Sequence, residues 1–259
     1  MIKGKRSFGW VPDRPDQRDY LYSAIRPVVR LPAKTDLREF CSIVENQGML
    51  GSCTANALAG NLEYLDKRGL SDSVSRRRRL TESDYTDVSR LFIYYNERVL
   101  ENTVDYDSGA SLRDGIKTLR KHGACWEKTW PYLIERFTRK PSKKCYLEAK
   151  KHRIESYHRI NSLPEMLSCL AEGYPFVFGF TVYESFQSQA VAKTGIAHMP
   201  RKKEKALGGH AVLAVGYNQK DKRFLVRNSW GTKWGKDGYF TMPYEYLETL
   251  SADFWTIRK

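Results

Sequence analysis

The apolar positions divide the chain into a helical first half and a strand-rich second half. After Cys53, the side chains of Leu58, Leu62 and Leu65 recur at helical spacing. This spacing predicts a buried helix of about four turns that ends near Gly69. Two further helices are predicted over residues 89–101 and 111–122.

Beyond Pro141 the pattern changes to alternation and to short apolar runs. Residues 153–160 alternate, and residues 176–182 form an apolar run that is typical of a buried strand. Further strands are predicted over residues 209–217, 222–228 and 237–242. Helices followed by strands predict an α+β fold with two lobes and a cleft between them.

The boundaries of this organisation can be placed approximately. The domain is predicted to cover residues 31–259, with a helical lobe over about 31–150 and a sheet lobe over about 151–259. An extension over residues 1–30 precedes it, in which prolines and alternating charges argue against a regular helix.

The aromatic residues of the extension include Trp10, Tyr20 and Tyr22. They predict that this arm docks on the rest of the protein, because aromatic residues in a solvated tail would bury no surface. Two interpretations stay open. The arm lies across or beside the cleft and restricts access to it, or it packs on the outside as a partly disordered tail.

The charge balance narrows the range of partners. The chain has 44 Lys and Arg against 30 Asp and Glu, a net charge of +14, which predicts affinity for anionic ligands. The basic runs at 76–79 and 201–205 are the candidate contacts for a weak anionic ligand, although such runs are more often solvated loops. No specific nucleic-acid partner is predicted, and a monomer is expected.

The sequence contains neither an apolar run long enough to span a membrane nor a signal-peptide core after its first residues. The compartment stays open, with a secreted or periplasmic location favoured over the cytoplasm.

Five cysteines in a chain of this length do not form a disulfide framework, and the odd count leaves a free thiol. A bridge between Cys125 and Cys145 stays open, and Cys169 is predicted to be a core thiol. Closely spaced Cys and His pairs are missing, so neither a metal nor another cofactor is predicted.

Three local signatures carry the candidate chemistry. Gln47 stands six residues before Cys53, which opens the first predicted helix, where unpaired N–H groups and the helix dipole favour a thiolate. His210 follows two glycines at the start of a predicted strand, and Asn228 closes the next strand before Ser-Trp-Gly. Cys, His and Asn in this order, each within its own signature, resemble the papain-like cysteine peptidases from about residue 31 to the end.

The resemblance implies a papain-like fold with a helical N-terminal lobe and a β-barrel-like C-terminal lobe. It also implies an endopeptidase in which Cys53 attacks the peptide carbonyl, His210 transfers protons and Asn228 orients the imidazole. Gln47 would stabilise the oxyanion together with the Cys53 N–H group. The resemblance assigns substrate binding or support of the site to Gly109, Ala110, Gly179, Gly208, Gly209, Ala211 and Trp230. The small residues among them predict a pocket that admits bulky apolar or aromatic side chains.

Two positions depart from the family pattern. Leu50 stands where the family usually has a bridging cysteine, and Thr54 stands where it usually has an aromatic residue. Neither change removes a reacting group, so altered packing is expected rather than loss of activity. The intact set favours an active peptidase over an inactive or occluded binding protein on the same scaffold. Acyl transfer to an amine instead of water stays open.

Overall fold

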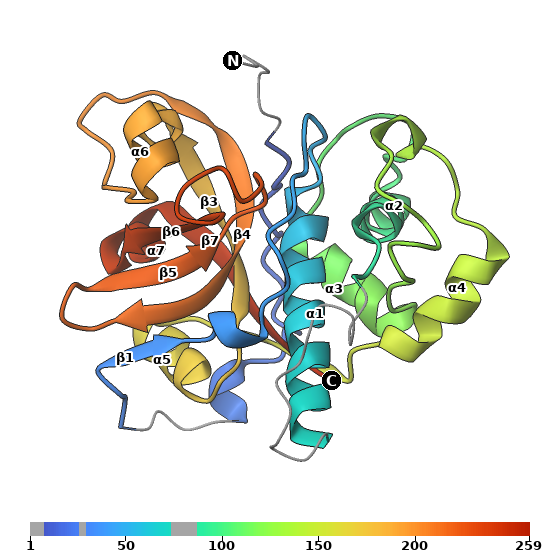
Figure 1. Ribbon diagram of the computed structural model, residues 1–259, viewed down its shortest axis with the longest axis horizontal. Coiled ribbons are helices and arrows are strands. Elements are labelled where there is room, and N and C mark those ends of the chain that lie inside the picture. Colours follow the sequence, from blue (N-terminus) through green and yellow to red (C-terminus); the bar gives the residue numbers. More distant parts are fainter. Residues whose placement is uncertain (1–7, 26–29, 74–86) are drawn as a thin grey trace.

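Helix α1 (Cys53–Ser73) stands between two lobes in the computed structural model, which describes residues 8–25, 30–73 and 87–259 (Figure 1). Leu58 and Leu62 are fully buried along this helix, as their spacing predicts. The predicted end near Gly69 is wrong, because the helix continues to Ser73. A Cβ at Gly69 would meet no neighbouring atom within 4 Å. A glycine in such an open position costs a helix only about 1 kcal/mol, so it does not have to end there.

The helical lobe contains α2 (Arg90–Glu101), α3 (Leu112–Lys121) and the short α4 (Lys143–Ala149). The hydroxyl of Ser89 accepts a hydrogen bond from Phe92 N at 3.0 Å, and the hydroxyl of Ser111 accepts one from Asp114 N at 3.3 Å. These caps satisfy N–H groups that lack partners inside the helix. The caps explain why α2 and α3 begin one residue after the predicted starts.

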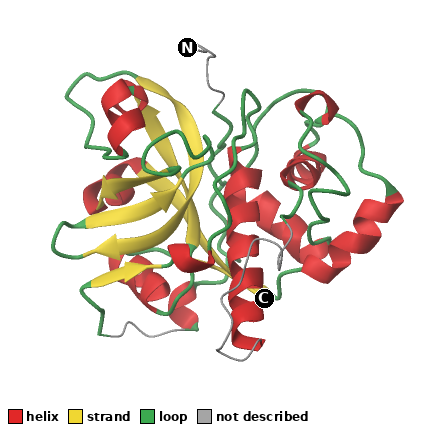
Figure 2. Ribbon diagram, in the orientation of Figure 1, coloured by secondary structure: helices red, strands yellow, loops and turns green. Residues whose placement is uncertain are grey.

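The second lobe is an antiparallel sheet of seven strands within the described residues (Figure 2). Its main path runs in the order β2-β7-β3-β4-β5-β6, and β1 pairs with β4. The strands are β1 (Lys34–Asp36), β2 (Ser156–Arg159), β3 (Phe176–Tyr183), β4 (Ala206–Asn218), β5 (Arg223–Arg227), β6 (Tyr239–Pro243) and β7 (Ser251–Arg258). The helices of this lobe are α5 (Leu163–Ala171), α6 (Gln189–Thr194) and α7 (Tyr244–Leu250). A helical N-terminal lobe beside an antiparallel sheet confirms the predicted α+β class.

The two lobes do not divide the chain as simply as the pattern predicts. Strand β1 lies within the range expected for the helical lobe, yet it pairs with β4 in the sheet. Three residues are too few to show a period, which explains why the pattern misses this strand. The arm also belongs to the sheet lobe at one point, because Tyr22 is fully buried in its core. Above this anchor, the arm runs between the lobes toward the top of the molecule (Figure 1).

Within the described ranges, no helix is both long enough and apolar enough to cross a membrane. The longest of them, α1, carries charged residues and packs between the lobes.

Candidate functional site

Cys53 is the first residue of α1 and is fully buried. The carbonyl of Ser52 accepts the first hydrogen bond of the helix, from Asn56 N at 3.0 Å. The Ser52 hydroxyl is hydrogen-bonded to the Tyr132 hydroxyl and to the Asn56 side chain. Burial raises the pKa of the Cys53 thiol to about 11, against the lowering effect of N–H groups from Ala211 and from Gly9 of the arm. With the arm in place, the thiol is therefore covered.

His210 and Asn228 meet as neighbours in the sheet. His210 lies on β4 and Asn228 directly follows β5, and the imidazole Nε2 is 2.8 Å from Asn228 Oδ1. Trp230 stacks on the imidazole with ring centroids 4.8 Å apart, and the Phe180 ring stands edge-on at 5.8 Å. Both His210 and Asn228 are buried, so their hydrogen bond is shielded from water. Because Nε2 faces Asn228, Nδ1 is the nitrogen on the opposite side of the ring.

Gln47 is held between the two lobes. Its Oε1 accepts a hydrogen bond from the Ser229 hydroxyl at 2.6 Å, and its Nε2 donates to the Leu50 carbonyl at 2.9 Å. Its backbone N–H also donates to the Ser229 carbonyl at 2.9 Å. An amide nitrogen carries two N–H groups, so the bond to Leu50 fixes the direction of the second. The Gln47 side-chain amide is thus oriented by Ser229, which follows Asn228, and by Leu50, which lies three residues before Cys53.

The arm occupies the space between the two lobes at this site. Ala110 N donates to Gly9 O at 2.8 Å and Val11 N donates to Ala110 O at 3.0 Å, which pairs the arm with the loop before α3. On the other side, Trp10 N donates to Gly209 O at 3.1 Å. The backbone of the arm is therefore hydrogen-bonded to both lobes beside Cys53.

The aromatic residues of the arm cover the small residues predicted to form a pocket. A Cβ at Gly179 would lie 1.9 Å from the Trp10 ring, and one at Gly209 would lie 2.7 Å from it. A Cβ at Gly208 would meet the Phe8 side chain at 3.0 Å. The space that these glycines leave open is therefore filled by bulky aromatic rings.

A buried charge network, which sequence reasoning missed, anchors the arm. The Asp253 carboxylate accepts hydrogen bonds from Trp10 Nε1 at 3.1 Å and from Asp13 N at 2.7 Å. Asp13 in turn accepts from Trp255 Nε1 at 2.8 Å and from Arg113 N at 3.1 Å. The available signal was the run of acidic residues in the arm at positions 13, 16 and 19. The partners of Asp13 come from α3 and β7, and spacing along the chain does not predict such contacts.

All five cysteines are free thiols. Cys125 and Cys145 lie in one small buried cluster with Phe92 and Ala149, without a bridge between them. Cys169 is buried in the core of the sheet lobe, as its spacing predicts.

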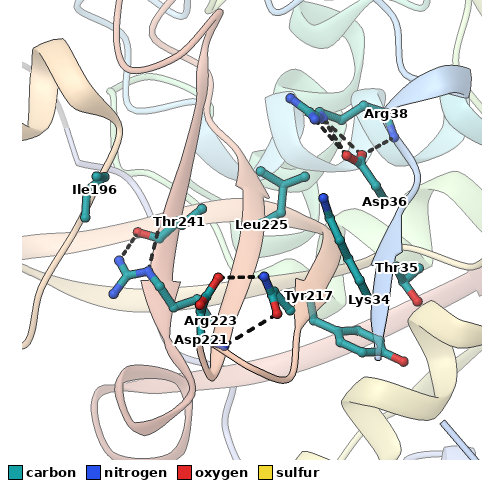
Figure 3. A pocket seen from close by; sticks show the side chains of 11 residues that line it. Lys34, Thr35, Asp36, Arg38, Ile196, Tyr217, Asp221, Arg223, Leu225 and Thr241 are labelled. Carbon is teal, nitrogen blue, oxygen red and sulfur yellow. Dashed lines mark hydrogen bonds and ion pairs between the residues drawn. The ribbon is translucent and has the colours of Figure 1, made fainter. Parts of the chain in front are cut away.

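Among the described residues, two hollows on the sheet lobe share no lining residue with the Cys53 site. One, of about 380 Å³, is lined by residues of β1, β4, β5 and β6; within it Arg38 forms an ion pair with Asp36, and Arg223 donates a hydrogen bond to the Thr241 hydroxyl (Figure 3). The other, of about 930 Å³, is bordered by part of the basic run 201–205. Glu204 within that run accepts hydrogen bonds from Ser185 N and Arg201 N, so an anion would meet a carboxylate there. The other basic run, 76–79, lies outside the described residues.

Comparison with known proteins identifies the class. Residues 31–249 match the papain family of cysteine proteases, and the chain belongs to this family. It is a cysteine endopeptidase with the papain-like fold.

Among individual proteins, the chain is 42% identical to an uncharacterized peptidase C1-like protein of Acanthamoeba polyphaga mimivirus, over 98% of this chain and 87% of the relative. It is 41% identical to xylellain, a cysteine protease from Xylella fastidiosa, with a TM-score of 0.85 over 100% of this chain and 99% of that structure. A cysteine proteinase of Brassica napus is 28% identical over 85% of this chain and 62% of its own length. The predicted family membership is confirmed.

Proposed function

We propose that this cysteine protease cleaves peptide bonds with Cys53 as nucleophile, His210 as proton carrier and Asn228 as the residue that orients His210. The observation that carries this proposal is the His210 Nε2 to Asn228 Oδ1 contact of 2.8 Å, beside a cysteine at the N-terminus of α1. Because Nε2 contacts Asn228, Nδ1 is the nitrogen proposed to exchange a proton with the thiol. Departure of the arm would return the Cys53 thiol to a less buried setting and lower its pKa.

The reaction then follows in two halves. The Cys53 proton passes to His210, the thiolate attacks the substrate carbonyl, and His210 returns the proton to the departing amine. His210 next takes a proton from water, whose oxygen attacks the thioester and releases the acid and the thiol. In both halves, the second N–H of Gln47 and the Cys53 backbone N–H would stabilise the negative oxygen.

The same surfaces that hold the arm are proposed to bind substrate. Gly109 and Ala110 offer backbone for pairing with a peptide, and Trp230 screens the His210–Asn228 bond. The pocket bordered by Gly179, Gly208, Gly209 and Ala211 would accept a bulky apolar or aromatic side chain. The contact of Trp10 with two of these glycines supports that preference.

We further propose that the arm inhibits the enzyme until it is displaced. Three backbone hydrogen bonds join residues 9–11 to the cleft, and Gly9 lies against the Cys53 thiol. Tyr22 is buried in the core of the sheet lobe, so only the segment before it can leave without loss of core packing.

The test is hydrolysis of a fluorogenic peptide library under reducing conditions by the chain carrying Trp10→Ala, which weakens docking of the arm, and by the same chain carrying Cys53→Ala as well. The matched control is Cys169→Ala, which removes a buried thiol away from the site. Activity should disappear only in Cys53→Ala, and activity that survives this change contradicts the proposed nucleophile. Adding a competing amine separates hydrolysis from acyl transfer through the ratio of acid to amide products.

A further inference from the structure

Asp107 joins the two loops that face each other across the narrow part of the cleft. Its carboxylate accepts hydrogen bonds from Gly51 N, at 3.1 Å to Oδ1 and 2.9 Å to Oδ2. The Tyr94 hydroxyl donates to Asp107 Oδ1 and itself accepts a hydrogen bond from Gly109 N at 3.1 Å. A continuous path of hydrogen bonds therefore connects Gly51, two residues before Cys53, to Gly109, at the edge proposed to bind substrate.

The middle of this path is rigid. Tyr94 lies on α2 and is fully buried, and the Arg98 guanidinium stacks over its ring with the central carbon 4.1 Å from the ring centroid. Arg98 also donates to the carbonyls of Val104 and Tyr106 at 2.8 and 3.2 Å, which holds the loop that carries Asp107. Burial raises the pKa of Tyr94, so its hydroxyl remains a donor at neutral pH.

The two connected loops enclose a slot with room for little more than a peptide backbone. Gly9 of the arm fills it, and a Cβ built on Gly9 would lie 1.7 Å from Gly51 O. A Cβ on Gly109 would lie 2.1 Å from Gly9 O. The separation of Gly51 from Gly109 thus decides whether a main chain fits beside Cys53.

We infer that Asp107 and Tyr94 are positioning residues that set the width of this slot and align the substrate backbone with Cys53. The inference rests on the proposed function of the cleft, and it adds residues that touch neither substrate nor reacting atoms. No disulfide ties these loops, because all five cysteines are free thiols and Leu50 stands at the position before Gly51. The carboxylate and phenol supply this connection by hydrogen bonds instead.

The test uses Tyr94→Phe and Asp107→Asn in the full chain, each combined with Trp10→Ala to weaken docking of the arm. Loss of a hydrogen bond to a charged group changes an equilibrium by about tenfold or more. KM for a peptide substrate should therefore rise about tenfold, while kcat changes less. Iodoacetamide, which is too small to need the slot, should alkylate Cys53 at an unchanged rate. Tyr64→Phe is the matched control, because its buried hydroxyl also donates one hydrogen bond, to Gly173 O.

A second measurement does not depend on hydrolysis. In the full chain with Trp10 intact, hydrogen exchange of the Val11 and Ala110 amides reports how firmly the slot holds the arm. Tyr94→Phe should make both exchange about tenfold faster, whereas Tyr64→Phe should not. Unchanged exchange, or an equal loss of peptide and iodoacetamide reactivity, overturns the positioning role. If the Trp10→Ala chain fails to hydrolyse peptides while exchange in the full chain responds as expected, the proposed function fails and the role of Asp107 and Tyr94 in setting the width of the slot stands.

Discussion

Replacing Trp10 by alanine should activate the enzyme, because this side chain contributes a large part of the docking of the arm. Its ring lies on Gly179 and Gly209, and its Nε1 donates to Asp253. Truncating a fully buried aromatic residue costs about 3–5 kcal/mol, and Trp10 is half-buried, so roughly 2 kcal/mol is lost. The hydrogen bond to the carboxylate adds about 1.5 kcal/mol. The sum, about 3.5 kcal/mol, corresponds to a rise of roughly a few hundredfold in the open population.

The assay is the initial rate of peptide hydrolysis at substrate concentrations well below KM. Trp10→Phe keeps an aromatic ring without the N–H donor and should lie between wild type and Trp10→Ala. Val11→Ala, which alters an exposed side chain of the same arm, is the matched control and should leave the rate unchanged. If Trp10→Ala matches wild type within threefold while both are active, the arm does not limit access to Cys53, and the inhibitory role is wrong.

Three further outcomes are expected. Burial, together with the nearby Asp13, raises the pKa of Asp253 to about 6. The docked arm therefore favours the protonated carboxyl of Asp253. Docking should be strongest below the ordinary Asp pKa of about 4 and should weaken as the pH rises through 6. Asp253→Asn, which suits the left-handed backbone at φ 58°, should remove this pH dependence from the exchange protection of the Val11 amide, and a retained dependence would assign it to another group. Tyr22→Ala should lower the free energy of unfolding by about 3–5 kcal/mol in urea titrations, whereas a loss below about 1 kcal/mol would mean that this part of the arm is dispensable. Gln47→Ala should lower kcat by about 10²–10³, since one donor to the oxyanion is lost, and a change below fivefold would remove Gln47 from that role.

The sequence predicted most of the regular structure, because its apolar periods are clear. Leu58 and Leu62 mark the buried face of α1, and serines mark the starts of α2 and α3. The failures have local causes. The helix end predicted at Gly69 is wrong because this position is open enough for a helical glycine, and β1 is too short to show alternation.

The candidate reacting residues could be proposed from sequence because each lies in a distinctive local string. The contacts of the arm could not, since they join residues that are far apart in the chain. Asp253 meets Trp10 across 243 positions and Asp13 across 240. Asp107 and Gly51 are 56 positions apart, and an aspartate in a glycine-containing loop gives no sign of which loop it holds.

The most direct test of the account is the site and rate of alkylation by iodoacetamide in wild type and in Gly9→Val. The valine Cβ would lie 1.7 Å from Gly51 O, so the arm could not keep its place over Cys53. We predict one adduct on Cys53, formed at least tenfold faster in Gly9→Val, with Cys41, Cys125, Cys145 and Cys169 unmodified. Equal rates in the two proteins would contradict the covering role of the arm. A first adduct on any other cysteine would contradict the assignment of Cys53 as the nucleophile.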